Sequence, residues 1–304
     1  MTNQKHNRSP DRKPQKERIR EITEQLEAGV QAVFESDNYR EYLKCMSRFH
    51  NYSVNNCLLI ALQRPNASLV AGYQAWKRDH GRQVKKGEKG IRILAPCKYK
   101  VESEEMDENG EPKMMELTGF RVVTVFDYAQ TEGRELPTIG AHELTGDVDD
   151  YQKLFRAMTS ICPVPIGFES IEGGAKGYYN DTEKRIAIQS GMSQIQTIKT
   201  LIHEMAHAKL HAKEARDPDH PIDRRTKEVE AESTAFCVAS ALGIDTSEYS
   251  FGYVAGWSSG RETKELKSSL ERIRAASDEM ITAIDRSFER QARRGKQKDR
   301  DEGR

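Results

Sequence analysis

Residues 203–207, HEMAH, place two imidazoles four positions apart, with a carboxylate beside the first. Apolar residues recur at helical spacing through 192–216, a run without Gly or Pro, so we expect the motif on a helix. Side chains four positions apart share one helix face, and His203 and His207 can therefore bind the same zinc ion. Glu204 points to the side, where it can hold a metal-bound water and act as general acid and base.

A catalytic zinc needs a third protein ligand and keeps a fourth position open. The metzincin pattern requires glycine at 210 and histidine at 213, but Leu210 and Lys213 stand there, which excludes that class. His211 follows His207 by one helical turn and stays an alternative ligand. A surface or supporting role suits it better, because successive pairs four apart drift round a helix.

Three glutamates, Glu228, Glu230 and Glu232, lie in a segment that predicts a further helix. Glu228 and Glu232 share a face with apolar residues, whereas Glu230 lies about 200° round the helix from Glu228 and is expected to face solvent. We therefore predict Glu228 as the third zinc ligand. Glu232 is predicted to accept a histidine N–H and fix the tautomer of that ring.

This ligand set predicts hydrolysis of a peptide bond, in which Glu204 takes a proton from water and passes it to the leaving amine. The spacing does not choose between Tyr253 and His220 as the group that stabilises the oxyanion. Residues 185–189 predict a strand just before the metal helix, and we expect an extended peptide to pair with its edge.

The N-terminal half contains a basic cluster, with nine basic and two acidic residues over 73–100. Such a cluster neutralises phosphates whatever the base sequence. The turn 85–90, KKGEKG, with Arg82 is expected to contact the DNA backbone, and nearby aromatic and amide side chains are expected to contact unpaired bases. The predicted nucleic-acid contacts are Arg82, Lys85, Lys86, Lys89, Trp76, Tyr52 and Asn55. The alternative is that the aromatic residues are core and the lysines a solvated face.

The positions of apolar residues predict which elements hold these sites. Helices are expected over 19–34, 39–62, 150–161, 192–214, 225–243 and 266–288. Strands are expected over 91–95, 120–126, 177–179 and 185–189. The acidic segment 102–116 is expected to be a hairpin excursion between the first two strands.

Length and composition predict a two-domain protein of the cytoplasm. The 304 residues include 48 Lys and Arg and 48 Asp and Glu, so net charge gives no argument for nucleic-acid binding. The apolar run 57–62 is far below the roughly 20 residues of a membrane span, and the N-terminus lacks the apolar core of a secretory signal. Five cysteines without a CxxC pair argue against a disulfide framework and a cysteine zinc site.

The expected organisation is α+β with two domains. It comprises a flexible basic arm at 1–15, an N-terminal domain at 16–135, a linker at 136–149, a C-terminal domain at 150–288 and a charged disordered tail at 289–304.

Five stretches in this order resemble the ArdC-like antirestriction proteins of plasmids and conjugative elements. They begin FHNYSVNN, FRVVTVFD, TLIHEMAH, KEVEAEST and DTSEYSFG, and together they are spread over residues 39–260. The resemblance implies an N-terminal domain that binds single-stranded DNA and a C-terminal zincin metallopeptidase domain with one Zn²⁺. It implies His203 and His207 as metal ligands, Glu204 as catalytic acid and base, and Glu228 as a third ligand of the gluzincin type.

The function implied is that of a cytoplasmic antirestriction protein of a mobile element, which binds single-stranded DNA and cleaves an unidentified peptide or protein. One alternative is a DNA-binding protein with a structural zinc and a vestigial peptidase. A second alternative is a zinc peptidase that cleaves a transcriptional repressor, with an N-terminal half that recognises protein. Salt-dependent binding to an oligonucleotide would favour the antirestriction hypothesis over this second alternative.

Overall fold

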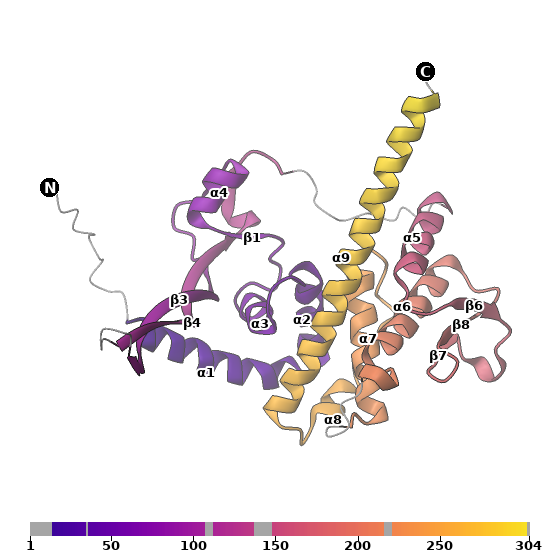
Figure 1. Ribbon diagram of the computed structural model, residues 1–304, viewed down its shortest axis with the longest axis horizontal. Coiled ribbons are helices and arrows are strands. Elements are labelled where there is room, and N and C mark those ends of the chain that lie inside the picture. Colours follow the sequence, from indigo (N-terminus) through magenta and orange to yellow (C-terminus); the bar gives the residue numbers. More distant parts are fainter. Residues whose placement is uncertain (1–13, 35, 107–111, 137–147, 216–220, 303–304) are drawn as a thin grey trace. The chain divides into compact units, whose positions relative to one another are not determined.

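The computed structural model describes residues 14–34, 36–106, 112–136, 148–215 and 221–302. Its chain forms two compact units, which are drawn in Figure 1. The first unit comprises Met1–Gly29 and Leu58–Arg134, and the second comprises Val30–Cys57 and Glu135–Arg304. Helices and strands occur in both units, so the predicted α+β class with two domains is confirmed.

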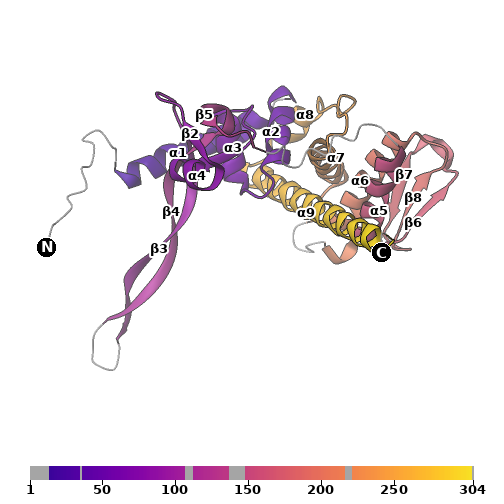
Figure 2. The ribbon, with the colours of Figure 1, turned by 90° about the horizontal axis from the view of Figure 1, so that it is seen from above.

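An antiparallel sheet in the order β1-β4-β3 organises the first unit. β3 (Ile91–Met106) and β4 (Pro112–Asp127) form a long hairpin, and β1 (Val70–Gly72) pairs with the end of β4. The two long strands contain the predicted short strands 91–95 and 120–126, together with the described parts of the acidic segment, 102–106 and 112–116. The outer half of β4 has exposed side chains on both faces, and the β3-β4 ribbon projects from the rest of the unit (Figure 2).

Smaller elements close the base of this sheet. β2 (Arg82–Val84) pairs with β5 (Thr131–Gly133), and α4 (Tyr73–His80) ends at Gly81, whose φ of 63° is the left-handed conformation that a glycine adopts without strain. The side chain of Trp76 in α4 is fully buried, and its indole N–H donates to the carbonyl of Phe126 at 2.8 Å. Trp76 therefore belongs to the core of the first unit.

Two helices cross the boundary between the units along the chain. α1 (Gln15–Val33) enters the second unit at Val30, and α3 (Val54–Gln63) enters the first unit at Leu58. The helix expected over 39–62 is in fact two, α2 (Ser36–Arg48) and α3, separated at residues 49–53.

The sheet of the second unit has the order β6-β8-β7. β6 (Ile166–Glu169) runs parallel to β8 (Arg185–Gln189), and β7 (Gly177–Asn180) runs antiparallel to it. The expectation that a peptide pairs with the edge of 185–189 is wrong, because β8 is the central strand and both its edges are occupied. Within the described residues, β7 is an edge strand of this sheet.

Helices of the second unit pack round α7 (Arg224–Ala241). It contacts α2, α6 (Gln194–Leu210) and α9 (Thr263–Glu302), while α6 also lies against β7 and β8. Figure 1 shows α7 between α6 and α9. Because neighbouring helices cover several faces, α7 is buried almost all round, and Glu230 is fully buried. The expectation that Glu230 faces solvent is wrong, since the pattern of α7 alone does not reveal the cover that α9 provides.

Residues 30–57 associate with the C-terminal part of the chain. The hydroxyls of Tyr39 in α2 and Ser233 in α7 lie 2.7 Å apart, and the thiol of Cys237 donates to the carbonyl of Leu43 at 3.5 Å. Each predicted domain is one continuous stretch of sequence, whereas each compact unit combines two separate stretches. The reason is that α2 packs against α7, a helix far away in the sequence.

The remaining helices are α5 (Val148–Ile161), which packs on α9, and the short α8 (Val254–Ser258). The disorder expected at 289–302 is wrong, because α9 continues to Glu302 through a segment without proline. The expected basic arm and linker lie largely outside the described residues. No helix in the described part of the chain is long and apolar enough to cross a membrane.

Candidate metal centre

Helix α6 presents His203 and His207 on one face, one turn apart. The hydroxyl of Ser193 accepts a hydrogen bond from the backbone N–H of Gln196 and caps the helix nearly three turns before the motif. The Nε2 atoms of the two histidines lie 3.1 Å apart. Two nitrogen lone pairs at this distance require a proton or a cation between them.

Glu228 approaches the same point from α7. Its Oε2 lies 3.7 Å from Nε2 of His203 and 3.6 Å from Nε2 of His207. Ligand atoms about 2.0–2.1 Å from one tetrahedral zinc lie roughly 3.3 Å from one another. The structure thus brings the three predicted ligands together at the spacing of a metal site, and two imidazoles with one carboxylate suit a divalent ion such as zinc.

This cluster stabilises positive charge between its ligand atoms. Burial lowers the pKa of His203, but contacts with Glu228 and Glu232 outweigh burial and raise it to about 10. Contacts with His203 and His207 hold the pKa of Glu228 well below its usual range. A divalent ion can take the place of the proton that these groups hold so tightly.

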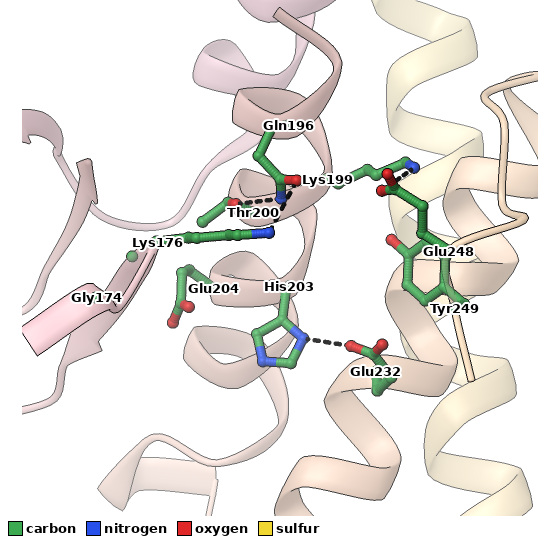
Figure 3. Close-up of a pocket in the computed structure, with 11 residues that line it drawn as sticks. Gly174, Lys176, Gln196, Lys199, Thr200, His203, Glu204, Glu232, Glu248 and Tyr249 are labelled. Carbon is green, nitrogen blue, oxygen red and sulfur yellow. Dashed lines mark hydrogen bonds and ion pairs between the residues drawn. The ribbon is translucent and has the colours of Figure 1, made fainter. Parts of the chain in front are cut away.

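Glu232 contacts the other side of the His203 ring. Its Oε2 lies 3.2 Å from Nδ1 of His203 (Figure 3). A carboxylate at this place accepts the Nδ1 proton and directs the Nε2 lone pair toward Glu228. Glu232 therefore lies where its predicted supporting role requires it.

Glu204 lies beside the ligand cluster. Figure 3 shows Glu204 and Glu232 on opposite sides of the His203 ring. Glu204 is only 7% exposed. Burial raises the pKa of its carboxyl, and the charges of His203 and His207 oppose this shift without reversing it. A carboxyl whose pKa is raised is suited to take a proton and give it back near neutral pH.

Gly177 of β7 leaves the space that Glu204 occupies. A Cβ at this position would lie 2.6 Å from Cγ2 of Thr200, 3.0 Å from the backbone oxygen of Ala187 and 3.3 Å from Cγ of Glu204. The close approach of β7 to α6 thus depends on glycine at 177.

Two cavities meet at the ligand cluster and share Gly177, His203 and Glu204. The first has a volume of about 410 Å³ and reaches Lys199 and Tyr249. The second has a volume of about 460 Å³ and is lined further on by Tyr178, Tyr179, Asp181, His207, His211, Arg224, Lys227 and Glu228. Space is therefore open on both sides of the candidate metal centre, beside the edge strand β7.

His211 is buried and supports His207. Its Nδ1 lies 3.1 Å from Nδ1 of His207, and its Nε2 lies 3.2 Å from Oε2 of Glu230. The alternative of His211 as a ligand does not fit, because it contacts the nitrogen of His207 that faces away from His203. Of the two roles that the sequence favoured, the surface position is wrong and the supporting one matches the geometry.

Tyr253 lies near the carboxylates of the site. The residue is 39% exposed, but desolvation of its hydroxyl raises its pKa, and the charges of Glu232 and Glu228 raise it further. Its side chain does not line either cavity. His220, the other candidate for oxyanion stabilisation, lies outside the described residues.

The predicted nucleic-acid contacts divide by burial. Lys85, Lys86 and Lys89 are exposed in the turn before β3, as expected. Arg82 is buried, and its guanidinium donates to Thr131 and to backbone carbonyls while it stacks on Tyr128. Arg82 and the buried Trp76 are therefore corrected to structural residues of the first unit.

Tyr52 and Asn55 are half-buried and fall in the second compact unit. The exposed aromatic residues of the β3-β4 ribbon, Tyr99 and Phe120, were not predicted as contacts. The sequence did offer one signal for Tyr99, which is that it stands between Lys98 and Lys100. Alternate residues of a strand face opposite sides, so a strand with basic residues on one side and an aromatic residue on the other can be exposed on both.

Two known families match the sequence. Residues 12–126 match the N-terminal domain of the anti-restriction factor ArdC, and residues 164–254 match the IrrE N-terminal-like domain, a peptidase family. The second match includes His203, Glu204, His207 and Glu228. This match indicates a metallopeptidase-like fold for residues 164–254 of the second unit.

An uncharacterized protein of Bacillus anthracis is 28% identical over 341 aligned positions, which include 99% of this chain and 57% of that protein. The chain therefore spans little more than half the length of this curated relative. The metal-free crystal structure of the antirestriction ArdC protein from plasmid R388 is 25% identical and covers 80% of this chain and 86% of its own, with a TM-score of 0.49. Its Mn(II)-bound structure is 20% identical and covers 88% and 97%, also with a TM-score of 0.49.

Proposed function

Because this chain is an ArdC-like two-domain protein, we propose that it joins a single-stranded-DNA-binding domain to a zinc-dependent peptidase domain. The observation that carries the peptidase assignment is the triangle of Nε2 of His203, Nε2 of His207 and Oε2 of Glu228, with Glu204 beside it. One ion suits this triangle, and the mixed nitrogen and oxygen donors favour zinc over magnesium or calcium.

The residues of the site divide the work of peptide hydrolysis. A bound zinc supplies a Lewis acid that polarises the scissile carbonyl and lowers the pKa of water. Glu204 receives the proton of the attacking water and delivers it to the leaving amine. Glu232 holds the Nδ1 proton of His203, so that Nε2 stays available as a ligand.

Strand β7 and the two cavities support binding of an extended peptide. In the described part of the chain no strand lies on the outer edge of β7, and this edge can add a strand through backbone hydrogen bonds. The cavities on both sides of His203 offer space for side chains before and after the scissile bond.

Exposed residues of the first unit support contact with single-stranded DNA. Lys85, Lys86 and Lys89 can neutralise phosphates, and Tyr99 and Phe120 offer exposed rings on which bases can stack. In the proposed role, the protein coats incoming single-stranded DNA of a mobile element in the cytoplasm of the recipient cell and limits host restriction.

Metal analysis of the purified full chain tests the centre. We expect one zinc ion per chain, and loss of that ion in Glu228→Ala. Glu248→Ala is the matched control, because Glu248 lines the first cavity but contacts Lys199 rather than the histidines. A wild-type protein without stoichiometric metal overturns the proposed centre.

Peptidase activity is tested on a mixture of unstructured peptides, with the products identified by mass spectrometry. Glu204→Gln should retain zinc and lose cleavage. If the wild type cleaves nothing while both proteins still bind an oligonucleotide, the zinc is structural and the peptidase vestigial. Weak oligonucleotide binding that does not respond to salt would instead favour a peptidase whose first unit recognises protein.

A further inference from the structure

His207 is followed by a chain of hydrogen-bonding partners that reaches a third helix. Its Nδ1 faces Nδ1 of His211 at 3.1 Å, and Nε2 of His211 faces Oε2 of Glu230 at 3.2 Å. Glu230 in turn contacts Ser269 and Arg272, which lie on α9. His211 and Glu230 are both buried.

The position of each proton in this series of hydrogen bonds follows from Glu230, the member farthest from the metal ligands. Oε1 of Glu230 accepts from the hydroxyl of Ser269 at 2.7 Å and from Nε and Nη2 of Arg272 at 2.9 and 2.6 Å. An arginine does not give up its proton, so the carboxylate beside it stays ionised and can only accept. The proton shared with His211 must then belong to Nε2 of that ring.

A neutral imidazole that donates from Nε2 accepts at Nδ1. Nδ1 of His207 must therefore carry a proton, which it donates to His211. This tautomer leaves the lone pair of His207 at Nε2, the atom that lies 3.6 Å from Glu228 and 3.1 Å from Nε2 of His203. Glu230 thus sets the position of the proton on His211, and His211 in turn sets the position of the proton on His207.

We infer that His211, Glu230 and Arg272 are positioning residues, which fix the tautomer of His207 in which it can bind the metal. His203 has a carboxylate for this purpose in Glu232, whereas His207 has a second histidine whose proton is set by Glu230. The inference rests on the proposed metal centre and adds a dependence on α9, a helix outside the two that supply the ligands.

Glu230→Gln tests the inference with almost no change of volume. The amide oxygen must face Arg272 and Ser269, so the amide NH₂ faces Nε2 of His211. That nitrogen must now accept, its proton moves to Nδ1, and Nδ1 confronts the proton on His207. We expect the affinity for Zn(II), measured in the full chain by competition with a chelator, to fall about 10- to 100-fold, as for partners of other ligand histidines.

Ser269→Ala is the matched control, because it removes one hydrogen bond to Oε1 without changing what Oε2 offers to His211. Its Zn(II) affinity should stay close to that of the wild type. Equal losses of affinity in both variants, or no loss in Glu230→Gln, would overturn the inference while leaving the metal centre intact.

A measurement on the wild type avoids the risk that a variant misfolds. Two-bond ¹H–¹⁵N spectra of the zinc-loaded, histidine-labelled chain report which ring nitrogen carries each proton. We expect His211 protonated at Nε2 alone and His207 protonated at Nδ1. A proton on Nδ1 of His211 overturns the inference, whereas failure of the chain to take up zinc overturns the proposed centre itself.

Discussion

Oε2 of Glu232 lies 3.2 Å from Nδ1 of His203, across the ring from the nitrogen that faces Glu228. Two carboxylates one turn apart on α7 thus take opposite ends of one imidazole. Glu232→Ala should weaken Zn(II) binding about 10- to 100-fold, because His203 loses the acceptor that fixes its tautomer. Glu232→Gln keeps an acceptor oxygen and should lose much less. Chelator competition measures both, and similar losses in the two variants would argue against tautomer control.

Gly177→Ala should destabilise the second unit by about 1–3 kcal/mol, since the added methyl meets Thr200 and the backbone oxygen of Ala187. The displaced strand should also disturb Glu204 and reduce peptidase activity. Gly167→Ala is the control in the same sheet, because a Cβ there meets nothing within 4 Å. Urea unfolding of the metal-free protein measures both changes, and equal stabilities of the two variants would contradict the packing described.

Asp181 connects the β7–β8 turn to the short segment that follows α6. It accepts from Nζ of Lys184 at 2.8 Å and from the backbone N–H of Lys213 at 3.2 Å, and the contact with Lys184 lowers the pKa of its carboxyl from 3.8 to about 2. A depressed folded-state pKa stabilises the fold above pH 3.8, and this contribution disappears as the pH falls toward 2.

The wild type should therefore lose more thermal stability than Asp181→Asn between pH 5 and pH 2, because the asparagine has no proton to gain. Above pH 5 the stability difference between the two proteins should be constant. A difference that does not change with pH across the whole range would show that Asp181 contributes no charge interaction.

Lys85, Lys86 and Lys89 should set part of the salt dependence of DNA binding. Each phosphate contact on a single strand contributes about 0.7 to the slope of log K against log salt, so replacing all three with alanine should reduce the slope by about 2. Alanine at the exposed Lys153, Lys213 and Lys264 removes the same charge from the second unit and serves as control. An unchanged slope in the first variant places the phosphate contacts elsewhere.

The elements that carry the metal centre were predictable because their signals are local. The HExxH spacing, the helical pattern round it and the shared face of Glu228 and Glu232 each lie within a few turns of one helix. Burial of Trp76 was one of two interpretations that the sequence left open, and burial of Arg82 was not predicted, because their partners Phe126 and Thr131 lie about fifty residues away. Without knowledge of those partners, a cluster of basic and aromatic residues indicates a binding surface.

The sequence alone determined which residues can bind a metal and which helix faces bear them, since helix periodicity fixes the direction of a side chain from its position. Tertiary structure decided which other helix or strand packs against each of these faces. It buried Glu230 under α9, placed His211 beside His207, put β7 rather than β8 at an edge of the sheet and packed α2 against α7. These outcomes depend on packing between segments distant in sequence, which no pattern within one segment encodes.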